Sequence, residues 1–356
     1  MKKVFAAIKA FCKRKDIEIS AKRYGIDALG AMAQGLFCSL LIGTIMNTLG
    51  KQLGIPFFET IGGYASEMAG PAMAIAIGYA LKAPNLVLFS LATVGWSANQ
   101  LGGAGGPLAV LIIAIIAAEA GKCVSKETKI DILVTPLVTI CVGVGLSAWW
   151  APGIGAAASA FGNLIMWATE LQPFLMGIAV AVIVGIALTL PISSAAICAA
   201  LGLTGLAGGA AVAGCCAQMV GFAAMSFREN RWGGLVSQGL GTSMLQMGNI
   251  VRNPRIWIPP TLASAITGPI ATCIFHLEMN GPAVSSGMGT CGMVGPIGVY
   301  SGWISDVASG AKEAITAMDW VGLALICIVL PAILSVIFCE ILRKIGLIKE
   351  NDLKLS

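Results

Sequence analysis

Apolar stretches separated by short polar or basic segments follow one another along the whole chain. Uninterrupted stretches cover about residues 26–49, 61–81, 130–150, 174–190, 256–275 and 320–342. A helix of about 20 apolar residues crosses the hydrocarbon core of a bilayer, which is about 30 Å thick. The pattern therefore predicts an all-α, polytopic integral membrane protein with about 8–10 transmembrane helices.

One long apolar stretch, residues 86–120, is interrupted by a glycine-rich segment that runs from Asn99 to Pro107. Each flank has about 13 residues, or roughly 20 Å of helix, which is too short to cross the core. Lys82 precedes the stretch and Lys122 follows it, so both ends are expected on the cytoplasmic side. The pattern predicts a re-entrant hairpin.

Two further segments are predicted to be irregular. Residues 233–250 are only weakly apolar and have basic residues at both ends, which predicts another re-entrant segment. Residues 279–300 form a second glycine-rich break. In addition, the aromatic pair Trp149 and Trp150, followed by Pro152, predicts an interfacial turn that ends one apolar stretch and begins the next.

The composition separates this chain from soluble proteins. Apolar residues make up 57% of the 356 residues and charged residues only 11%. A soluble domain is about a quarter charged, so this chain lacks the polar surface that a water-soluble protein needs. The chain also contains 45 glycines, many within apolar stretches, where small residues let membrane helices approach closely.

The N-terminal segment, residues 1–24, is basic and amphipathic, and we expect it to lie along the membrane surface. The positive-inside rule places both termini in the cytoplasm. We therefore predict a cytoplasmic segment at 1–24, a single transmembrane domain at 25–342 and a cytoplasmic tail at 343–356. The net charge of +5 reflects this topology and gives no indication of a nucleic-acid partner.

The sequence contains no motif for catalysis, metal binding or disulfide bonding. Its eleven cysteines are scattered without a C-x-x-C pair, and His276 is the only histidine. Neither a P-loop nor a G-x-S-x-G nucleophile elbow occurs. We predict no catalytic residue, no metal and no cofactor.

The two glycine-rich breaks share a short pattern, which predicts an internal repeat. Residues 101–110 and 290–299 both contain G-x-x-G-P followed by apolar residues that end in valine. Transporters often carry such repeats, and their substrates bind near the midplane where interrupted helices meet. Because glycine is abundant in this chain, chance similarity is the alternative, and the relative orientation of the two halves stays open.

Interrupted backbone inside a membrane survives only where it is buried in protein or lines a wet cavity. Polar residues at the two breaks, and ionisable residues inside spans, are therefore candidate substrate ligands. We predict that the substrate lies between the two breaks. The candidate residues are Glu67, Asn99, Gln100, Gly103, Gly105, Gly106, Glu278, Asn280, Ser285, Ser286 and Thr290. The structural alternative is that the glycines permit close helix packing and that Glu67 bonds a neighbouring helix.

Residues 248–260 (GNIVRNPRIWIPP), their continuation at 263–272, and the segments 281–283 and 295–298 resemble a family of stand-alone bacterial membrane proteins. These proteins are similar to enzyme IIC of the phosphotransferase system and include the perfringolysin O regulator-like proteins. The resemblance implies a homodimeric, elevator-type transporter with helical hairpins in the bacterial cytoplasmic membrane. It also implies separate IIA and IIB partners, with this chain acting at most as the IIC permease component.

We expect a membrane transporter for a small polar solute such as a sugar, a sugar acid or an organic anion, in contact with membrane lipid. Coupling to phosphotransfer, coupling to an ion gradient and facilitated diffusion are all open. One alternative is a membrane sensor that regulates gene expression with a IIC-like fold but without transport. The other is a passive channel.

Overall fold

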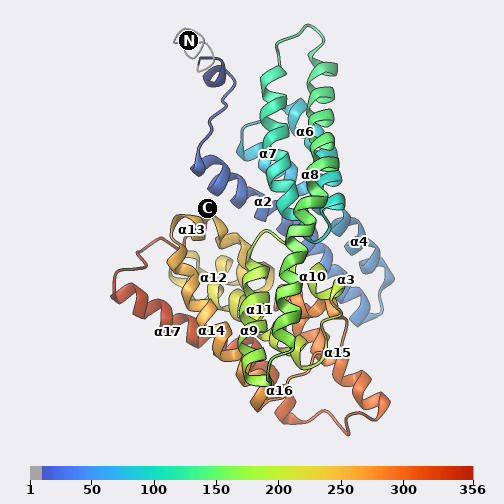
Figure 1. The fold of residues 1–356 in the computed structure, drawn as a ribbon, viewed down its shortest axis with the longest axis vertical. Coiled ribbons are helices and arrows are strands. Elements are labelled where there is room, and N and C mark those ends of the chain that lie inside the picture. Colours follow the sequence, from blue (N-terminus) through green and yellow to red (C-terminus); the bar gives the residue numbers. More distant parts are fainter. Residues whose placement is uncertain (1–9, 356) are drawn as a thin grey trace. The chain divides into compact units, whose positions relative to one another are not determined.

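The computed structural model describes residues 10–355, and its regular elements are helices (Figure 1). By internal contacts the chain divides into two compact units. Unit 1 comprises residues 1–40 and 64–156, and unit 2 comprises residues 41–63 and 157–356. The all-α fold class predicted from the hydrophobic pattern is confirmed, while the prediction of one transmembrane domain stays a prediction.

The elements of unit 1 are η1 (Arg23–Asp27), α2 (Ala28–Leu36), most of η2 (Phe37–Leu41), α5 (Ala69–Ala80), α6 (Asn85–Gly102), η3 (Gly103–Gly105), α7 (Gly106–Val124) and the first part of α8 (Asp131–Thr169). α5 lies at the centre of this group, because it packs against α2, α6 and α7. Alanine and glycine on α5 and α6 allow close contact. A Cβ added at Gly95 would lie 2.2 Å from the carbonyl oxygen of Gly70.

The helices α6 and α7 pack side by side as a hairpin around the first glycine-rich break. Their lengths differ from the prediction, since they contain 18 and 19 residues rather than about 13 each. At 1.5 Å per residue both approach 30 Å. The difference arises because Asn99 and Gln100 stay helical and Pro107 lies in the first turn of α7, where proline costs no hydrogen bond. Only Gly103–Gly105 leaves the α-helical path.

α8 corrects a second prediction. We expected Trp149, Trp150 and Pro152 to form a turn, but α8 runs through them as one helix of 39 residues. Its length is about 58 Å, which is nearly twice the thickness of the hydrocarbon core. A proline inside a membrane helix is tolerated when neighbouring groups satisfy the freed carbonyl, so Pro152 does not end the helix.

The elements of unit 2 are α3 (Ile42–Leu53), most of α4 (Pro56–Glu67), the end of α8, α9 (Pro173–Thr189), α10 (Ser194–Ala200), α11 (Gly205–Met225), α12 (Phe227–Val236), η4 (Ser237–Gly241), η5 (Ser243–Gln246), α13 (Met247–Arg252), η6 (Pro254–Trp257), α14 (Ile258–Pro269), η7 (Ile270–Ile274), η8 (Ala283–Gly287), η9 (Cys291–Met293), α15 (Val294–Ser309), α16 (Ala317–Ala324), η10 (Leu325–Val329) and α17 (Leu330–Lys344). The predicted irregular segments are confirmed as short helical pieces, in contrast to the long helices around them.

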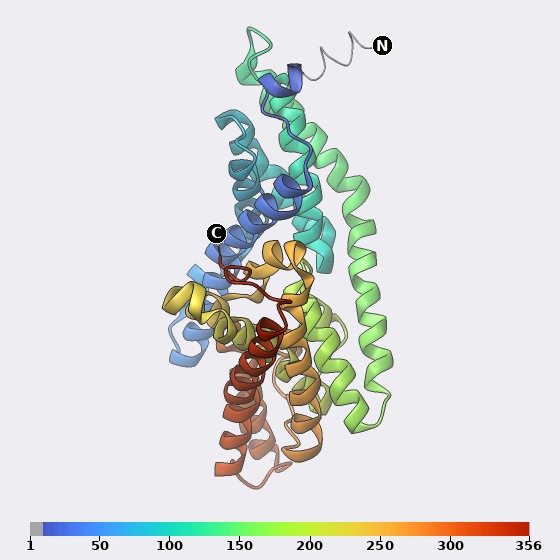
Figure 2. The same cartoon turned by 90° about the vertical axis from the view of Figure 1, so that its left-hand side faces the viewer.

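α11 forms the centre of unit 2. It packs against α9, α14 and α17, and α14 and α17 lie beside each other (Figures 1 and 2). Small residues make these contacts possible. A Cβ added at Gly214 would lie 1.9 Å from the carbonyl oxygen of Ala181 on α9, and one at Gly268 would lie 2.0 Å from that of Gly177. This is the packing by small residues that membrane helices use.

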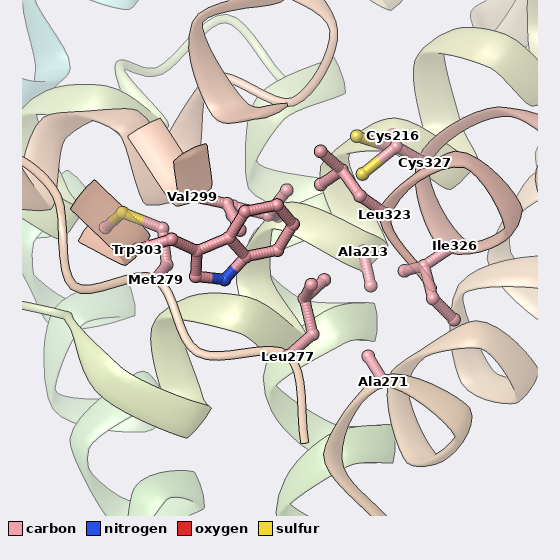
Figure 3. Packing of buried hydrophobic residues seen from close by; sticks show 11 residues of the cluster. Ala213, Cys216, Ala271, Leu277, Met279, Val299, Trp303, Leu323, Ile326 and Cys327 are labelled. Atoms are coloured by element: carbon pink, nitrogen blue, oxygen red, sulfur yellow. The ribbon is translucent and has the colours of Figure 1, made fainter. Parts of the chain in front are cut away.

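A cluster of apolar side chains joins α11 to the segment before α15 (Figure 3). Leu277 and Met279 come from the irregular segment, and Trp303 comes from α15. They pack with buried residues of α11, η7, α16 and η10. The second glycine-rich break is therefore fixed to helices on both of its sides.

Five helical stretches in the described part of the chain are long and apolar enough to cross a membrane. They are Arg23–Leu53, Asn85–Val124, Asp131–Thr169, Gly205–Met225 and Ala317–Lys344, and α5 and α9 are shorter apolar helices. Large apolar side chains such as Ile132, Trp149 and Ile333 are exposed on them. Such a surface fits contact with lipid better than contact with water. The number of crossings stays a prediction.

The close contact at Gly214 is testable. Gly214→Ala should lower the thermal stability of the purified protein in detergent, because overpacking at a fixed backbone contact costs about 1–3 kcal/mol. Gly145→Ala is the matched control, because Gly145 is also helical but has no atom within 4 Å of its Cβ position. It should leave stability unchanged or raise it slightly. Equal effects of the two changes would contradict the packing described here.

Candidate functional site

The first break places its predicted site residues in different surroundings. Asn99 lies at the hairpin contact of α6 and α7, since a Cβ added at Gly106 would lie 2.5 Å from its Oδ1 atom. Gln100 is exposed. Gly103 has a φ of +48° and an open Cβ position, whereas Gly105 approaches the carbonyl oxygen of Ile154 closely. Only Asn99, Gly105 and Gly106 have an evident packing role.

Glu67 is exposed at the last position of α4. The helix is interrupted directly after it, because Met68 has φ and ψ angles of −81° and 6° and α5 begins at Ala69. Among the described residues, no hydrogen bond or ion pair of the Glu67 side chain is found. The structural alternative, a bond from Glu67 to a neighbouring helix, therefore finds no support in the described chain.

The second break is held in place by backbone hydrogen bonds. The N–H of Leu277 donates to the carbonyl oxygen of Ala271 at 2.8 Å. Gly205 and Met279 exchange two hydrogen bonds, of 3.0 and 2.9 Å, and this pair is the one β-bridge in the described residues. Gly209 leaves room for this segment, because a Cβ there would collide with the carbonyl oxygen of Leu277. The irregular segment thus packs along the first two turns of α11.

The hydroxyl side chains of this break are buried and bind to backbone. Ser286 donates to the carbonyl oxygen of Leu203 at 2.6 Å, and Thr290 donates to that of Gly239 in η4. Ser285 is also buried, next to Gly298. The break at 283–293 therefore contacts the segment at 233–250. Thr290 holds this junction together, while Ser286 ties the break to the loop that precedes α11.

The two breaks share local structure as well as sequence. In each, the first glycine of G-x-x-G-P has a positive φ, +48° at Gly103 and +52° at Gly292. A short 3-10 turn precedes an α-helix that carries the proline near its start. The positive φ explains why glycine stands at this position in both. The duplication itself stays a prediction.

A polar pocket of about 250 Å³ lies beside the second break in unit 2. We call it the polar pocket, and it is lined by His276, Glu278, Asn280, Trp303, Asp306, Ala311 and Lys312. The Asn280 Nδ2 atom donates to Glu278 Oε2 at 3.1 Å and to Asp306 Oδ2 at 2.9 Å. One amide thus holds two carboxylates together.

The wall of the polar pocket combines an aromatic ring with a cation. Lys312 Nζ lies 5.6 Å from the centroid of the Trp303 ring and forms an ion pair with Asp319 at 2.7 Å. The Trp320 ring meets Trp303 edge to face at 5.6 Å. The lysine is therefore fixed over the tryptophan by a carboxylate and a cation–π contact. The polar pocket is thus lined both by a hydrogen-bond donor, Lys312, and by the acceptor carboxylates of Glu278 and Asp306.

The segment at 233–250, which is predicted to be re-entrant, contains a buried ladder of side-chain amides. Gln246 Nε2 donates to Gln238 Oε1 at 2.9 Å, and Asn249 Nδ2 donates to Gln246 Oε1 at 2.7 Å. Gln246 also donates to the carbonyl oxygen of Leu353 in the C-terminal tail at 2.9 Å. These polar side chains can be buried because each finds a hydrogen-bond partner inside the protein.

The geometry of unit 2 combines long apolar helices, interrupted helices that meet inside the unit, and a small polar pocket. The sequence profile of the family described as "Phosphotransferase system, EIIC" matches residues 26–355, which is nearly the whole chain. The chain belongs to the phosphotransferase system EIIC family. Comparison with curated proteins and with solved structures finds no match.

Membership of the EIIC family confirms the resemblance stated from residues 248–298. EIIC proteins are the multi-pass membrane permeases of the phosphotransferase system. They bind a small-molecule substrate and work with separate IIA and IIB components. No group of three or more His, Cys, Asp or Glu side chains in the described part of this EIIC protein is placed to hold a metal ion.

Part of the polar pocket of this EIIC protein was missed from the sequence. Glu278 and Asn280 were predicted, but Trp303, Asp306 and Lys312 were not. These residues follow Asn280 by more than 20 positions, and they return to it only because α15 folds back. The available signal was the group of aromatic and charged residues at 303–312 within an otherwise apolar region.

Ser286 provides a test of the structural role assigned to the buried hydroxyls. Ser286→Ala should lower the thermal stability of this EIIC protein by about 1 kcal/mol, because the hydrogen bond to Leu203 is lost. Ser309→Ala is the control, since that exposed hydroxyl bonds only within its own helix. Unchanged stability together with weaker solute binding would instead make Ser286 a solute ligand.

Proposed function

We propose that this EIIC-family protein moves a small polar solute across the bacterial cytoplasmic membrane, and that the polar pocket of unit 2 contacts that solute. The single observation that carries the proposal is the pair of carboxylates, Glu278 and Asp306, held by one amide of Asn280. A sugar, a sugar acid or an organic anion is the proposed substrate class. Both termini are proposed to be cytoplasmic and the protein to be a homodimer.

The chemistry of the polar pocket suits a solute with several hydroxyl groups. A carboxylate accepts hydrogen bonds only, whereas lysine donates them and a neutral histidine does both. Glu278, Asp306, Lys312 and His276 supply all three kinds of group within one cavity. The volume of about 250 Å³ is slightly below the usual range for drug-sized ligands, which favours a single small solute.

We further propose that unit 2 carries the solute as one body, as an elevator-type transporter does. Its helices are in close contact around α11, and the second break is tied to the start of that helix by the two backbone hydrogen bonds between Gly205 and Met279. Close-packed interiors shift as whole bodies more readily than they deform. Glu67, Asn99, Gln100 and the three glycines of the first break stay proposed solute contacts on unit 1.

Solute binding tests the role of the polar pocket. Full-length protein in liposomes is offered a panel of sugars, sugar acids and organic anions, and the solute that binds is used to compare variants. Glu278→Gln should weaken binding about tenfold, because an acceptor that makes a charge-assisted hydrogen bond is replaced by a neutral amide. Thermal stability should stay unchanged, because Glu278 is exposed.

Glu313→Gln is the matched control for this experiment. Glu313 is an exposed glutamate in the same stretch of chain as Lys312, but it does not line the polar pocket. Its replacement should leave binding unchanged. Equal losses in the two variants, or no binding by any solute of the panel, would contradict the proposal.

Coupling to phosphotransfer is a separate prediction. In vesicles that contain the protein, we expect the solute to appear inside as a phosphate ester only when a phosphorylated IIB component is enclosed inside the vesicles, at the cytoplasmic face of the protein. Chromatography of the vesicle contents distinguishes the ester from the free solute. Accumulation of free solute without IIB would contradict this coupling and favour ion-coupled or facilitated transport.

A further inference from the structure

A second cavity, of about 430 Å³, lies in unit 1 where both ends of the α6–α7 hairpin meet the N-terminal segment. We call it the basic cavity. It is lined by Arg14, Lys15, Asp16, Lys82, Pro84, Lys122, Ser125, Lys126 and Glu127. Five cations therefore face two carboxylates. None of these residues lines the polar pocket, and the proposed transport function does not involve this cavity.

Two buried cations form the base of this region. Lys122 is 2% exposed, and its Nζ atom donates to the carbonyl oxygens of Asp16 and Leu81 at 2.7 and 3.0 Å. Its ion pair with Glu119 measures 3.0 Å. Arg23 is 8% exposed and also donates to the Leu81 carbonyl oxygen, at 2.9 Å. These contacts hold the loop that begins at Leu81 in place.

The N-terminal segment supplies a second pair of cations, which share one carboxylate. Arg14 pairs with Glu127 at 2.8 Å, and Lys15 contacts the same carboxylate. The hydrogen bond from Lys15 holds the pKa of Glu127 below its ordinary value, and nearby Arg14 adds to this effect. A hydrogen bond from Arg23 likewise lowers the pKa of Asp16. Both carboxylates therefore remain charged at neutral pH.

Lys82 and Lys126 differ from these cations. Both are exposed, and neither forms an ion pair within the described residues. Their backbones place them at the cavity, because each follows the end of a helix with a left-handed φ, +55° at Lys82 and +60° at Lys126. Such angles are uncommon for residues other than glycine. Neither ammonium group is held in an ion pair among the described residues, and the nearest opposing charges are Asp16 for Lys82 and Asp131 for Lys126.

α6 contributes backbone donors to the same place. The helix begins at Asn85 after Pro84, and no side chain caps its first turn. The first N–H groups of a helix have no partner within the helix, and its N-terminus carries a partial positive charge. A smaller neighbouring pocket, lined by Pro84, Asn85, Leu86, Ser125, Lys126 and Asp131, adjoins the basic cavity at this end. The two spaces share Pro84, Ser125 and Lys126 in their linings, so the first turn of α6 lies next to the basic cavity.

We propose that the basic cavity binds a phosphate group through Lys82, Lys126 and the first turn of α6. Lysine binds phosphate as a point charge, and helix N-termini bind phosphate through their N–H groups. The volume of about 430 Å³ lies within the range of small-ligand sites, which leaves room for a group attached to the phosphate. Its source is either the headgroup of an anionic phospholipid or a soluble phosphorylated compound.

The experiment uses the full-length protein in nanodiscs of phosphatidylcholine. Sodium phosphate should raise the melting temperature of the unmodified protein, whereas sodium chloride at equal ionic strength should not. The double variant Lys82→Gln/Lys126→Gln should bind phosphate about tenfold more weakly, because two charge-assisted contacts are lost. The control, Lys13→Gln/Lys129→Gln, removes the same charge from exposed lysines that do not line the cavity.

A second arm distinguishes the two sources of phosphate. Nanodiscs that contain phosphatidylglycerol should raise the melting temperature if a lipid headgroup binds, and native mass spectrometry should then show fewer retained anionic lipids on the double variant. Stabilisation by inorganic phosphate alone identifies a soluble ligand. Equal effects of phosphate and chloride without stabilisation by phosphatidylglycerol, or equal behaviour of the two double variants, would overturn the proposal. Neither arm of the experiment depends on solute transport. Failure of the phosphate-binding proposal would therefore not bear on the proposed role of the polar pocket.

Discussion

Backbone N–H and C=O groups inside a bilayer must find partners within the protein, and the rest of this structure depends on that constraint. Long helices meet it by themselves. The second break meets it through its neighbours. The Leu277 N–H donates to the Ala271 carbonyl oxygen, and the Met279 N–H donates to that of Gly205. The Ser286 hydroxyl donates to the carbonyl oxygen of Leu203. Interrupted helices persist in unit 2 because α11 and its partners supply these bonds.

Close approach of backbones is the condition under which such bonds form. Gly209 and Gly214 on α11 leave the space that Leu277 and Ala181 occupy. A side chain at either position would push the irregular segment or α9 away. The abundance of glycine in the sequence and the survival of the breaks are therefore two aspects of one packing arrangement, and the polar pocket beside the second break depends on both.

The sequence was sufficient for the fold class and for the position of both breaks, because hydropathy and glycine clusters are local signals. It was insufficient for the extent of helices. Asn99 and Gln100 continue α6, and α8 passes through Pro152, since tertiary neighbours decide whether polar residues or proline end a helix. Asp306 joins Asn280 only through the fold of α15. Such long-range contacts leave no periodic signal in the chain.

Polar groups in this protein fall into two classes, and the difference bears on function. Ser286, Gln246 and Lys122 have their hydrogen bonds satisfied by backbone or by other side chains, so they stabilise the fold. The carboxylates of the polar pocket share one amide and keep further acceptor capacity, and Lys82 has no ion pair within the described chain. A group whose charge is already matched has little free energy left to offer a ligand, because binding would have to replace an existing bond. Unmatched charge at the edge of a packed unit is therefore the feature on which both proposed binding sites rest.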